Sequence, residues 1–173
     1  MILAIDVCYE ENKGYVAGIS FDQWEAEHPI RIYSSVVNNI ADYQSGEFYK
    51  RELPCILTLL EEHKILPNII VIDGYVTLGG DKPGLGQYLY EALESKVMIL
   101  GVAKNGFLDN CEHEMIYRGK SKKPLYITSL GISKDQAKKN IVNMYGKYRE
   151  PHLLKMADQL CREMAKQAEL ISE

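Results

Sequence analysis

Residues 69–74 read Ile-Ile-Val-Ile-Asp-Gly. Four successive β-branched residues without a polar position are typical of a strand that is buried on both faces, as in parallel sheets. Comparable apolar runs occupy residues 2–7 and 97–102. Three buried strands joined by amphipathic helices predict an α/β protein whose sheet carries helices on both faces.

The segments around these runs complete the pattern. Alternating polar and apolar residues, bounded by turn residues, predict two more strands and a hairpin over residues 15–21, 30–37 and 113–128. Helical spacing of apolar residues predicts helices over about 46–63, 85–95, 133–146 and from 151 onward. We therefore expect an antiparallel meander plus parallel strands in one mixed β-sheet flanked by helices, within a single domain of residues 1–173.

The composition is that of an ordinary globular protein, with 46% hydrophobic and 25% charged residues. No apolar run is long enough to cross a bilayer, and the N-terminus lacks a signal-peptide pattern. The four cysteines, Cys8, Cys55, Cys111 and Cys161, include no Cys-x-x-Cys pair, which favours reduced thiols over a zinc site. We expect a cytoplasmic monomer that makes no membrane contact.

The net charge of −4 conceals an uneven distribution. Residues 101–150 hold 10 lysines and arginines against 5 acidic residues, whereas the rest of the chain holds 10 against 19. Such a split indicates a basic face on an acidic body, with the stretches 118–123 and 134–139 as candidate phosphate contacts. The alternative is a solvated surface that has no charged partner.

Three acidic side chains occupy positions where the pattern predicts apolar ones. Asp6 and Asp73 follow the apolar runs of two predicted strands, and Glu52 lies within the apolar stripe of the first predicted helix. A buried carboxylate is costly unless it is paired or bound to a metal ion. Because the carboxyl ends of parallel strands share one edge, the three can meet there. Carboxylates without nearby cysteine or histidine favour Mg²⁺ or Mn²⁺, which can activate a water at a phosphate.

A lysine ends the third buried strand at the same predicted edge. Lys104 could neutralise charge on a scissile phosphate, or it could extend its ammonium group to solvent. Each acidic residue also has a structural alternative, because Asp73 precedes a glycine and fits a plain turn. Asp6 could likewise reach solvent from the end of its strand.

These residues lie in phrases that resemble the endonuclease V family, whose members cut nucleic acid near deoxyinosine or inosine. The matching phrases are, in chain order, Asp6-Val7-Cys8-Tyr9, the stretch from Tyr43 to Pro54, Ile72-Asp73-Gly74, Gly101-Val102-Ala103-Lys104, Tyr148-Arg149-Glu150-Pro151 and Ala157-Asp158. The resemblance extends over nearly the whole chain. It implies a ribonuclease-H-like fold and a phosphodiesterase that depends on Mg²⁺, with Mn²⁺ able to substitute.

The resemblance also implies a role for each matching residue. Asp6, Glu52 and Asp73 would bind the metal ion, and Lys104 would stabilise the transition state. Asp158 would serve a second metal ion or position the attacking water. The bond cut would be the second phosphodiester on the 3′ side of the inosine, leaving a 3′-hydroxyl and a 5′-phosphate.

Two regions that contact nucleic acid in the family differ in this sequence. The family's Tyr-Ile-Pro-Gly wedge is Tyr-Gln-Ser-Gly here, from Tyr43 to Gly46. Tyr43 can still stack on a base. We expect weaker duplex opening, because Gln-Ser replaces the apolar, rigid Ile-Pro. The family's Gly-His-Gly base pocket is Gly74-Tyr75-Val76 here, so Tyr75 replaces a histidine. We expect these two regions to contact nucleic acid, with altered recognition of the base.

The sequence therefore predicts a metal-dependent endonuclease that hydrolyses a phosphodiester bond in DNA or RNA, 3′ of inosine or of another flipped base. The alternative is a nucleic-acid-binding module of weak or no activity that keeps the fold. A third interpretation is a nucleotide-binding enzyme that cradles phosphate in the glycine-rich residues 79–86, although these lack the P-loop pattern.

Overall fold

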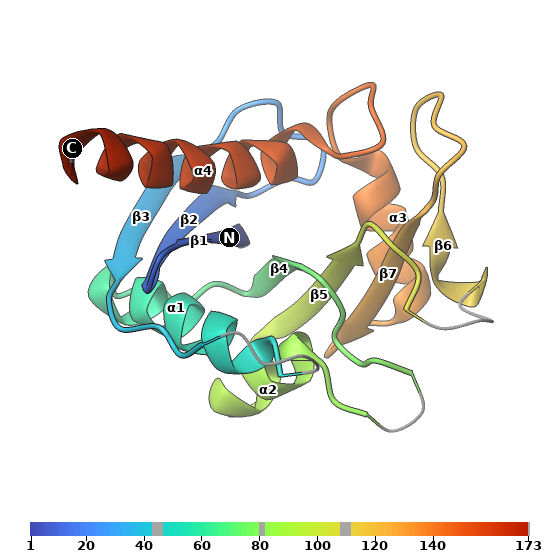
Figure 1. Ribbon diagram of the computed structural model, residues 1–173. Helices are drawn as coiled ribbons and strands as arrows, with labels where there is room; N and C mark the ends of the chain where they lie inside the picture. The colour runs from blue at the N-terminus through green and yellow to red at the C-terminus, as the bar shows by residue number, and fades with distance from the viewer. Residues whose placement is uncertain (43–46, 80–81, 108–111, 173) are drawn as a thin grey trace.

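The computed structural model describes residues 1–42, 47–79, 82–107 and 112–172 of the chain. The strands in these ranges are β1 (Ile2–Glu10), β2 (Lys13–Phe21), β3 (Arg31–Val37), β4 (Ile69–Asp73), β5 (Met98–Ala103), β6 (Met115–Ile116) and β7 (Leu125–Leu130). They form one sheet in the order β3-β2-β1-β4-β5-β7-β6 (Figure 1). The pairings of β1 with β4 and of β4 with β5 are parallel, and the remaining pairings are antiparallel. The predicted mixed sheet is confirmed.

Helices cover both faces of this sheet. They are α1 (Tyr49–Glu62), α2 (Leu85–Ala92), α3 (Lys134–Asn143) and α4 (His152–Ser172), with a short 3₁₀ turn η1 (Glu112–Glu114). Figure 1 shows α4 along one side of β1 and β2, with α1 and α2 on the opposite side. Among the described residues, none of the helices combines the length and apolar character needed to span a bilayer.

Alternation along the strands divides the core into two halves. On β1, Ile2 and Ala4 pack with residues of α3 and α4, whereas Leu3 and Ile5 pack with residues of α1 and α2. Successive side chains on a strand point to opposite faces, so each strand contributes to both halves. The apolar runs that predicted the strands are therefore buried on both faces, as expected.

The same alternation decides where the charged residues at the strand ends point. Asp6 continues the even-numbered series of β1 and so faces α4. Val71 and Val102 belong to the α4 half of the core, and Asp73 and Lys104 follow them by two positions. Three strands thus present their charged residues on one face of the sheet, beneath α4.

One strand boundary differs from the prediction. β1 was expected to end near residue 7, but it continues to Glu10 because its second half still pairs with β2. The pairing of β1 with β4 ends at Ile5 and Ile72. Asp6 therefore lies inside a strand and not at its end, immediately beyond the point where β1 and β4 stop pairing.

The beginning of α1 also differs. In the sequence, Phe48 lies four residues before Glu52, a spacing that predicts a place in the apolar stripe of this helix. The helix begins at Tyr49 instead, and Phe48 is 44% exposed at its N-cap. The sequence Ser133-x-x-Gln136 predicts a capping box at the start of α3, and the structure confirms half of it. The N–H of Gln136 donates to the Ser133 hydroxyl at 3.3 Å, whereas the Gln136 side chain contacts Asn140 and does not return to the cap.

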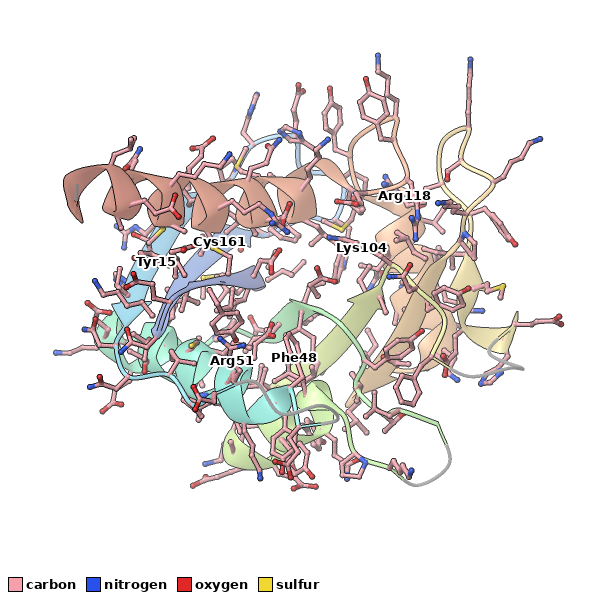
Figure 2. The ribbon with its side chains drawn as sticks, viewed as in Figure 1. Tyr15, Phe48, Arg51, Lys104, Arg118 and Cys161 are labelled. Atoms are coloured by element: carbon pink, nitrogen blue, oxygen red, sulfur yellow. The ribbon has the colours of Figure 1, made fainter. Side chains whose placement is uncertain are left out.

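Arg118 fixes the connection between α3 and α4. Its side chain is buried and donates hydrogen bonds to five backbone carbonyls, those of Val142, Met144, Gly146, Tyr148 and Arg149. Figure 2 shows Arg118 between this connection and the loop that precedes β7. A single guanidinium group therefore holds a segment that would otherwise lack regular hydrogen bonding.

Replacing Arg118 by methionine is expected to lower the free energy of unfolding by about 3 kcal/mol or more, because several carbonyls lose a charged donor at once. Urea denaturation of the two proteins measures the difference. Arg31→Met is a matched control, since Arg31 is exposed on the edge strand β3, and it should change stability by about 0.5 kcal/mol or less. Equal stability of the Arg118→Met and wild-type proteins would show that water replaces the guanidinium.

Candidate active site

Asp6 is buried on the α4 face, where β1 and β4 separate. Only 8% of the residue is exposed, and the N–H of Val7 donates to its Oδ1 at 2.8 Å. Burial and, after it, the negative charge of Asp73 raise the pKa of the Asp6 carboxyl to about 7, and Asp158 adds to the effect. A cation close to a buried carboxyl with a raised pKa would stabilise its ionised form.

Asp73 ends β4 and is paired with Lys104, which follows β5. The Lys104 Nζ donates to Asp73 Oδ2 at 3.0 Å and lies 3.8 Å from Oε2 of Glu150. Partial burial acts to lower the pKa of Lys104, but the charges of Asp73 and Glu150 outweigh it, so the pKa is raised. Figure 2 shows Lys104 between the end of β5 and the start of α4. The side chain is therefore held as a cation beside the carboxylates.

A cavity lies over these groups. Its polar lining comes from Asp6, Asp73, Lys104 and Glu150, and its apolar lining includes Pro151 at the start of α4. The structure thus brings together three residues that the sequence predicted to meet. It adds Glu150, which the sequence placed in a matching phrase but to which it gave no role.

Glu52 reaches the same region from α1, in the opposite helical layer. It is 2% exposed, and its Oε2 has no hydrogen-bond partner within the described part of the chain. Burial, followed by the charges of Asp6 and Asp73, raises the pKa of Glu52 well above its ordinary value. An unpaired buried carboxyl costs on the order of 1–3 kcal/mol of stability. Such a group, next to other perturbed carboxyls, is a candidate for function.

Asp158 lies on α4 and acts on the cluster from the helix side. Its charge contributes to the raised pKa of Asp6. Its Oδ1 accepts a hydrogen bond from Arg162 Nε at 2.7 Å, and its side chain is 22% exposed. Asp158 is therefore near the predicted site but is already paired with an arginine of its own helix.

The donor set fits a hard divalent cation. Carboxylate oxygens are the ligands such ions prefer, and the orphaned Oε2 of Glu52 is the kind of buried atom that a cation would satisfy. Among the described residues, no three acidic, histidine or cysteine side chains are already arranged as a complete ligand group. A cation at Asp73 would compete with Lys104, which contacts the same carboxylate.

A second pocket, about 150 Å³ in volume, shares Asp73 with the cavity. Its lining includes Gly74 and Tyr75, the predicted base-contacting residues, together with the aromatic rings of Phe48 and Tyr49. Gly74 has a φ of 132°, a backbone conformation that residues with side chains rarely adopt. The sequence missed Phe48 and Tyr49 as pocket residues because helical spacing assigned Phe48 to the core.

The polar groups beside Gly74 are used within the protein. The Tyr75 hydroxyl donates to the carbonyl of Asn105 at 2.7 Å. Val76 is fully buried, and its N–H donates to Oγ1 of Thr128 at 2.9 Å. Tyr75 therefore offers its ring to the pocket, and Val76 is a core residue with no part in it.

Two amides of the glycine-rich segment, among its described residues, are not free to bind a phosphate. The N–H of Gly84 donates to the carbonyl of Val76 at 2.9 Å, and that of Gly86 donates to the carbonyl of Tyr75 at 3.2 Å. These amides, which a phosphate would need, are already bonded to carbonyl groups. Within the described residues 79 and 82–86, the amides of Gly84 and Gly86 therefore give no support to a nucleotide-binding loop.

Two further predictions concern residues away from this cluster. Tyr43 and Gly46, expected to contact nucleic acid, lie outside the described residues. The basic stretch 118–123 borders a groove next to Glu150, whereas residues 134–139 belong mainly to α3. The two stretches therefore lie on different elements, a loop and a helix.

The sheet order and the flanking helices define a ribonuclease-H-like protein, with buried carboxylates gathered between the separating strands. The family model for endonuclease V matches residues 1–129. Endonuclease V of Streptomyces avermitilis is 25% identical over 189 residues, which cover 96% of this chain and 81% of the relative. The chain belongs to the endonuclease V family, a family of nucleases.

Two solved structures show the same fold. The crystal structure of endonuclease V from Bacillus subtilis matches with a TM-score of 0.81 at 18% identity, covering 97% of this chain and 81% of that one. Ciona intestinalis endonuclease V, crystallised in complex with a 24mer DNA containing an inosine followed by a ribo-adenosine, matches with a TM-score of 0.79 at 18% identity. That alignment covers 96% of this chain and 86% of the Ciona chain.

Proposed function

We propose that this protein is a metal-dependent endonuclease that hydrolyses a phosphodiester bond in DNA or RNA near an inosine or a similar flipped base. The observation that carries the proposal is the orphaned Oε2 of Glu52, buried beside the carboxyls of Asp6 and Asp73. Family membership supports the same activity. The inosine-containing DNA bound by the Ciona relative supports this choice of base.

Asp6, Glu52 and Asp73 are the proposed ligands of the metal ion. When bound, a divalent cation lowers the pKa of a coordinated water and stabilises negative charge on the phosphate. The three carboxyls come from two strands of the sheet and from α1, so their relative positions depend on both layers of the fold. In their present environment the pKa values of Asp6 and Glu52 are raised, and a cation would lower both pKa values and so favour the charged forms.

Lys104 would stabilise the charge that develops on the phosphate. A phosphate oxygen in the cavity would replace Asp73 or Glu150 as the partner of its ammonium group. The backbone carbonyl of Lys104 accepts a hydrogen bond from Arg149 Nη2, which fixes the chain at this point. A cation that is already oriented contributes more to a transition state than one that must reorganise.

The pocket beside Asp73 is the proposed site of the flipped base. Phe48, Tyr49 and Tyr75 offer aromatic surface there, and Gly74 carries no side chain that would block the base. The family histidine is a tyrosine here, so we expect the base to be held mainly by stacking. Because flipping costs least in single strands and at mismatches, we expect these substrates to be preferred over matched duplexes.

A cleavage assay tests this proposal. Single- and double-stranded DNA and RNA oligonucleotides, each with and without one inosine, are incubated with Mg²⁺, with Mn²⁺ or with EDTA. We expect metal-dependent cutting at one bond 3′ of the inosine, fastest on single strands, and no cutting in EDTA. The products should carry a 5′-phosphate and a 3′-hydroxyl.

The other outcomes of the assay separate the alternatives. Metal-dependent cutting without an inosine preference would retain the nuclease and reject the base specificity. A folded protein that binds the oligonucleotides but cuts none of them in either metal would reject the nuclease. It would then favour a binding module that keeps the fold.

A further inference from the structure

A basic groove lies next to the candidate active site, between the loop before β7 and the connection from α3 to α4. Its lining consists of Lys120, Ser121, Lys147, Tyr148, Arg149, Glu150 and Lys155, and its volume is about 590 Å³. Figure 1 shows the two loops side by side at the end of the molecule where α4 begins. We refer to this hollow as the basic groove.

Three lysines give the groove its charge. Lys120, Lys147 and Lys155 are all exposed, and none of them forms an ion pair with another described residue. Arg149 contributes less to the open surface, because its Nη2 donates to the carbonyl of Pro124 at 2.8 Å. Unpaired lysines around a hollow of this size favour a phosphate-bearing ligand.

An aromatic ring lies near two of these lysines. Tyr148 is 63% exposed, with Lys147 Nζ 5.3 Å and Lys155 Nζ 5.9 Å from the centre of its ring. An exposed ring flanked by cations is the arrangement that binds an unpaired base by stacking while the cations contact the adjoining phosphates. A base within a duplex has both faces covered, so the arrangement favours a single strand.

The groove is rigidly built. Arg118, beneath it, donates to the carbonyls of Tyr148 and Arg149. At Gly119, whose φ is 59°, an added Cβ would collide with the carbonyl oxygen of Lys147, so the two loops are in close contact. The backbone position of Tyr148 is therefore set before any ligand binds, which reduces the entropy lost on binding.

The groove is continuous with the candidate active site. Glu150 lines both the basic groove and the cavity over the carboxylates, and it lies 3.8 Å from Lys104. Asp73 in turn lines both that cavity and the aromatic pocket. The three hollows therefore form a series, with the aromatic pocket at one end, the carboxylates in the middle and the basic groove at the other end.

The geometry points to a second nucleic-acid subsite in the basic groove: it binds the single-stranded segment on the opposite side of the scissile phosphate from the flipped base, with one base stacked on Tyr148. This inference rests on the proposed function, because the flipped base and the scissile phosphate define the two sides. Lys147 and Lys155 contact the phosphates next to the stacked base. Since these contacts read no base edge, the subsite adds affinity without adding sequence preference.

Fluorescence anisotropy of a labelled single-stranded 12-mer DNA in EDTA tests the subsite without requiring cleavage. We expect Tyr148→Ala to weaken binding about 10-fold, and Tyr148→Phe, which keeps the ring, to bind like the wild type. The affinity falls as the salt concentration rises, so a plot of log affinity against log salt has a negative slope. The double variant Lys147→Ala/Lys155→Ala should make this slope less steep by about 1. Its matched control is Lys96→Ala/Lys166→Ala, two exposed lysines outside the groove and outside the basic stretches 118–123 and 134–139, which should leave the slope unchanged.

A blunt matched duplex and shortened strands complete the experiment. Tyr148→Ala should leave duplex binding unchanged. Shortening an inosine-containing strand from its 3′ end, beyond the scissile phosphate, should abolish the effect of the variant. Shortening the same strand from its 5′ end should leave the effect in place. Three results would overturn the subsite. Tyr148→Ala could bind single strands as tightly as the wild type, it could lose the same affinity for duplex as for single strands, or no form of the protein could bind single strands. If the wild type cuts no substrate but the groove variants bind single strands more weakly than it does, the proposed nuclease activity would be rejected and the groove would remain a nucleic-acid-binding site.

Discussion

Replacing Asp73 by asparagine is expected to abolish cleavage while leaving nucleic-acid binding largely intact. The carboxylate of Asp73 lies between the cavity and the aromatic pocket and accepts a hydrogen bond from Lys104. An amide in its place is a poor ligand for a divalent cation and no longer pairs with the lysine charge. We expect the single-turnover rate on a single-stranded inosine oligonucleotide to fall by about 1,000-fold, on the scale of losing one group that stabilises the transition state.

The control for this variant is Asp135→Asn, which makes the same chemical change at an exposed position of α3. It should cut at the wild-type rate. Binding of the same oligonucleotide in EDTA should change by less than about threefold in Asp73→Asn, because the remaining contacts to the strand are kept. Full activity of purified Asp73→Asn in Mg²⁺ would falsify the proposed metal mechanism.

In the absence of metal, the protein is expected to lose stability as the pH rises from about 4 to about 8. The pKa of Asp6 is about 7 in the folded state and near its ordinary value of 3.8 when unfolded. Between these values the folded state binds more protons than the unfolded state, so the free energy of unfolding falls as the pH increases. Glu52, whose pKa is also raised, acts in the same direction.

The Asp6→Asn variant removes the contribution of Asp6 and nearly preserves its shape, and it also removes one of the charges that raise the pKa of Glu52. Relative to the wild type in EDTA, the variant should gain stability on the order of 4 kcal/mol at pH 8 and markedly less at pH 5. Urea denaturation at the two pH values gives both differences. The same stability difference at pH 5 and pH 8 would show that Asp6 ionises freely in the folded protein.

Metal binding should reverse the loss of stability. A cation that requires the ionised carboxyls stabilises the folded state more at pH 8 than at pH 5, because fewer protons must be displaced. Mn²⁺ should therefore raise the Tm of the wild type more at the higher pH and leave the Tm of Asp6→Asn nearly unchanged. An equal rise in the Tm of the wild type and of Asp6→Asn would show that the ion binds at a site that does not include Asp6.

The local sequence was informative wherever burial is periodic. The apolar runs at 2–7, 69–72 and 97–102 correctly located β1, β4 and β5, and the helical stripe correctly pointed Glu52 inward. The same periodicity misplaced Phe48, because spacing cannot tell the first core position of a helix from its N-cap. It also ended β1 too early, because pairing with β2 continues after the apolar run has ended.

The sequence by itself determined the class of fold and the family and predicted the candidate site residues, because strand and helix periods and short motifs are encoded by neighbouring positions. Only the tertiary structure decided that Asp6, Asp73 and Lys104 share one face, since that depends on the register between strands. It alone placed Glu150 beside Lys104 and formed the basic groove. Arg118 holds that groove through carbonyls 24 to 31 residues away, and hydrogen bonds of such range leave no local pattern in a sequence.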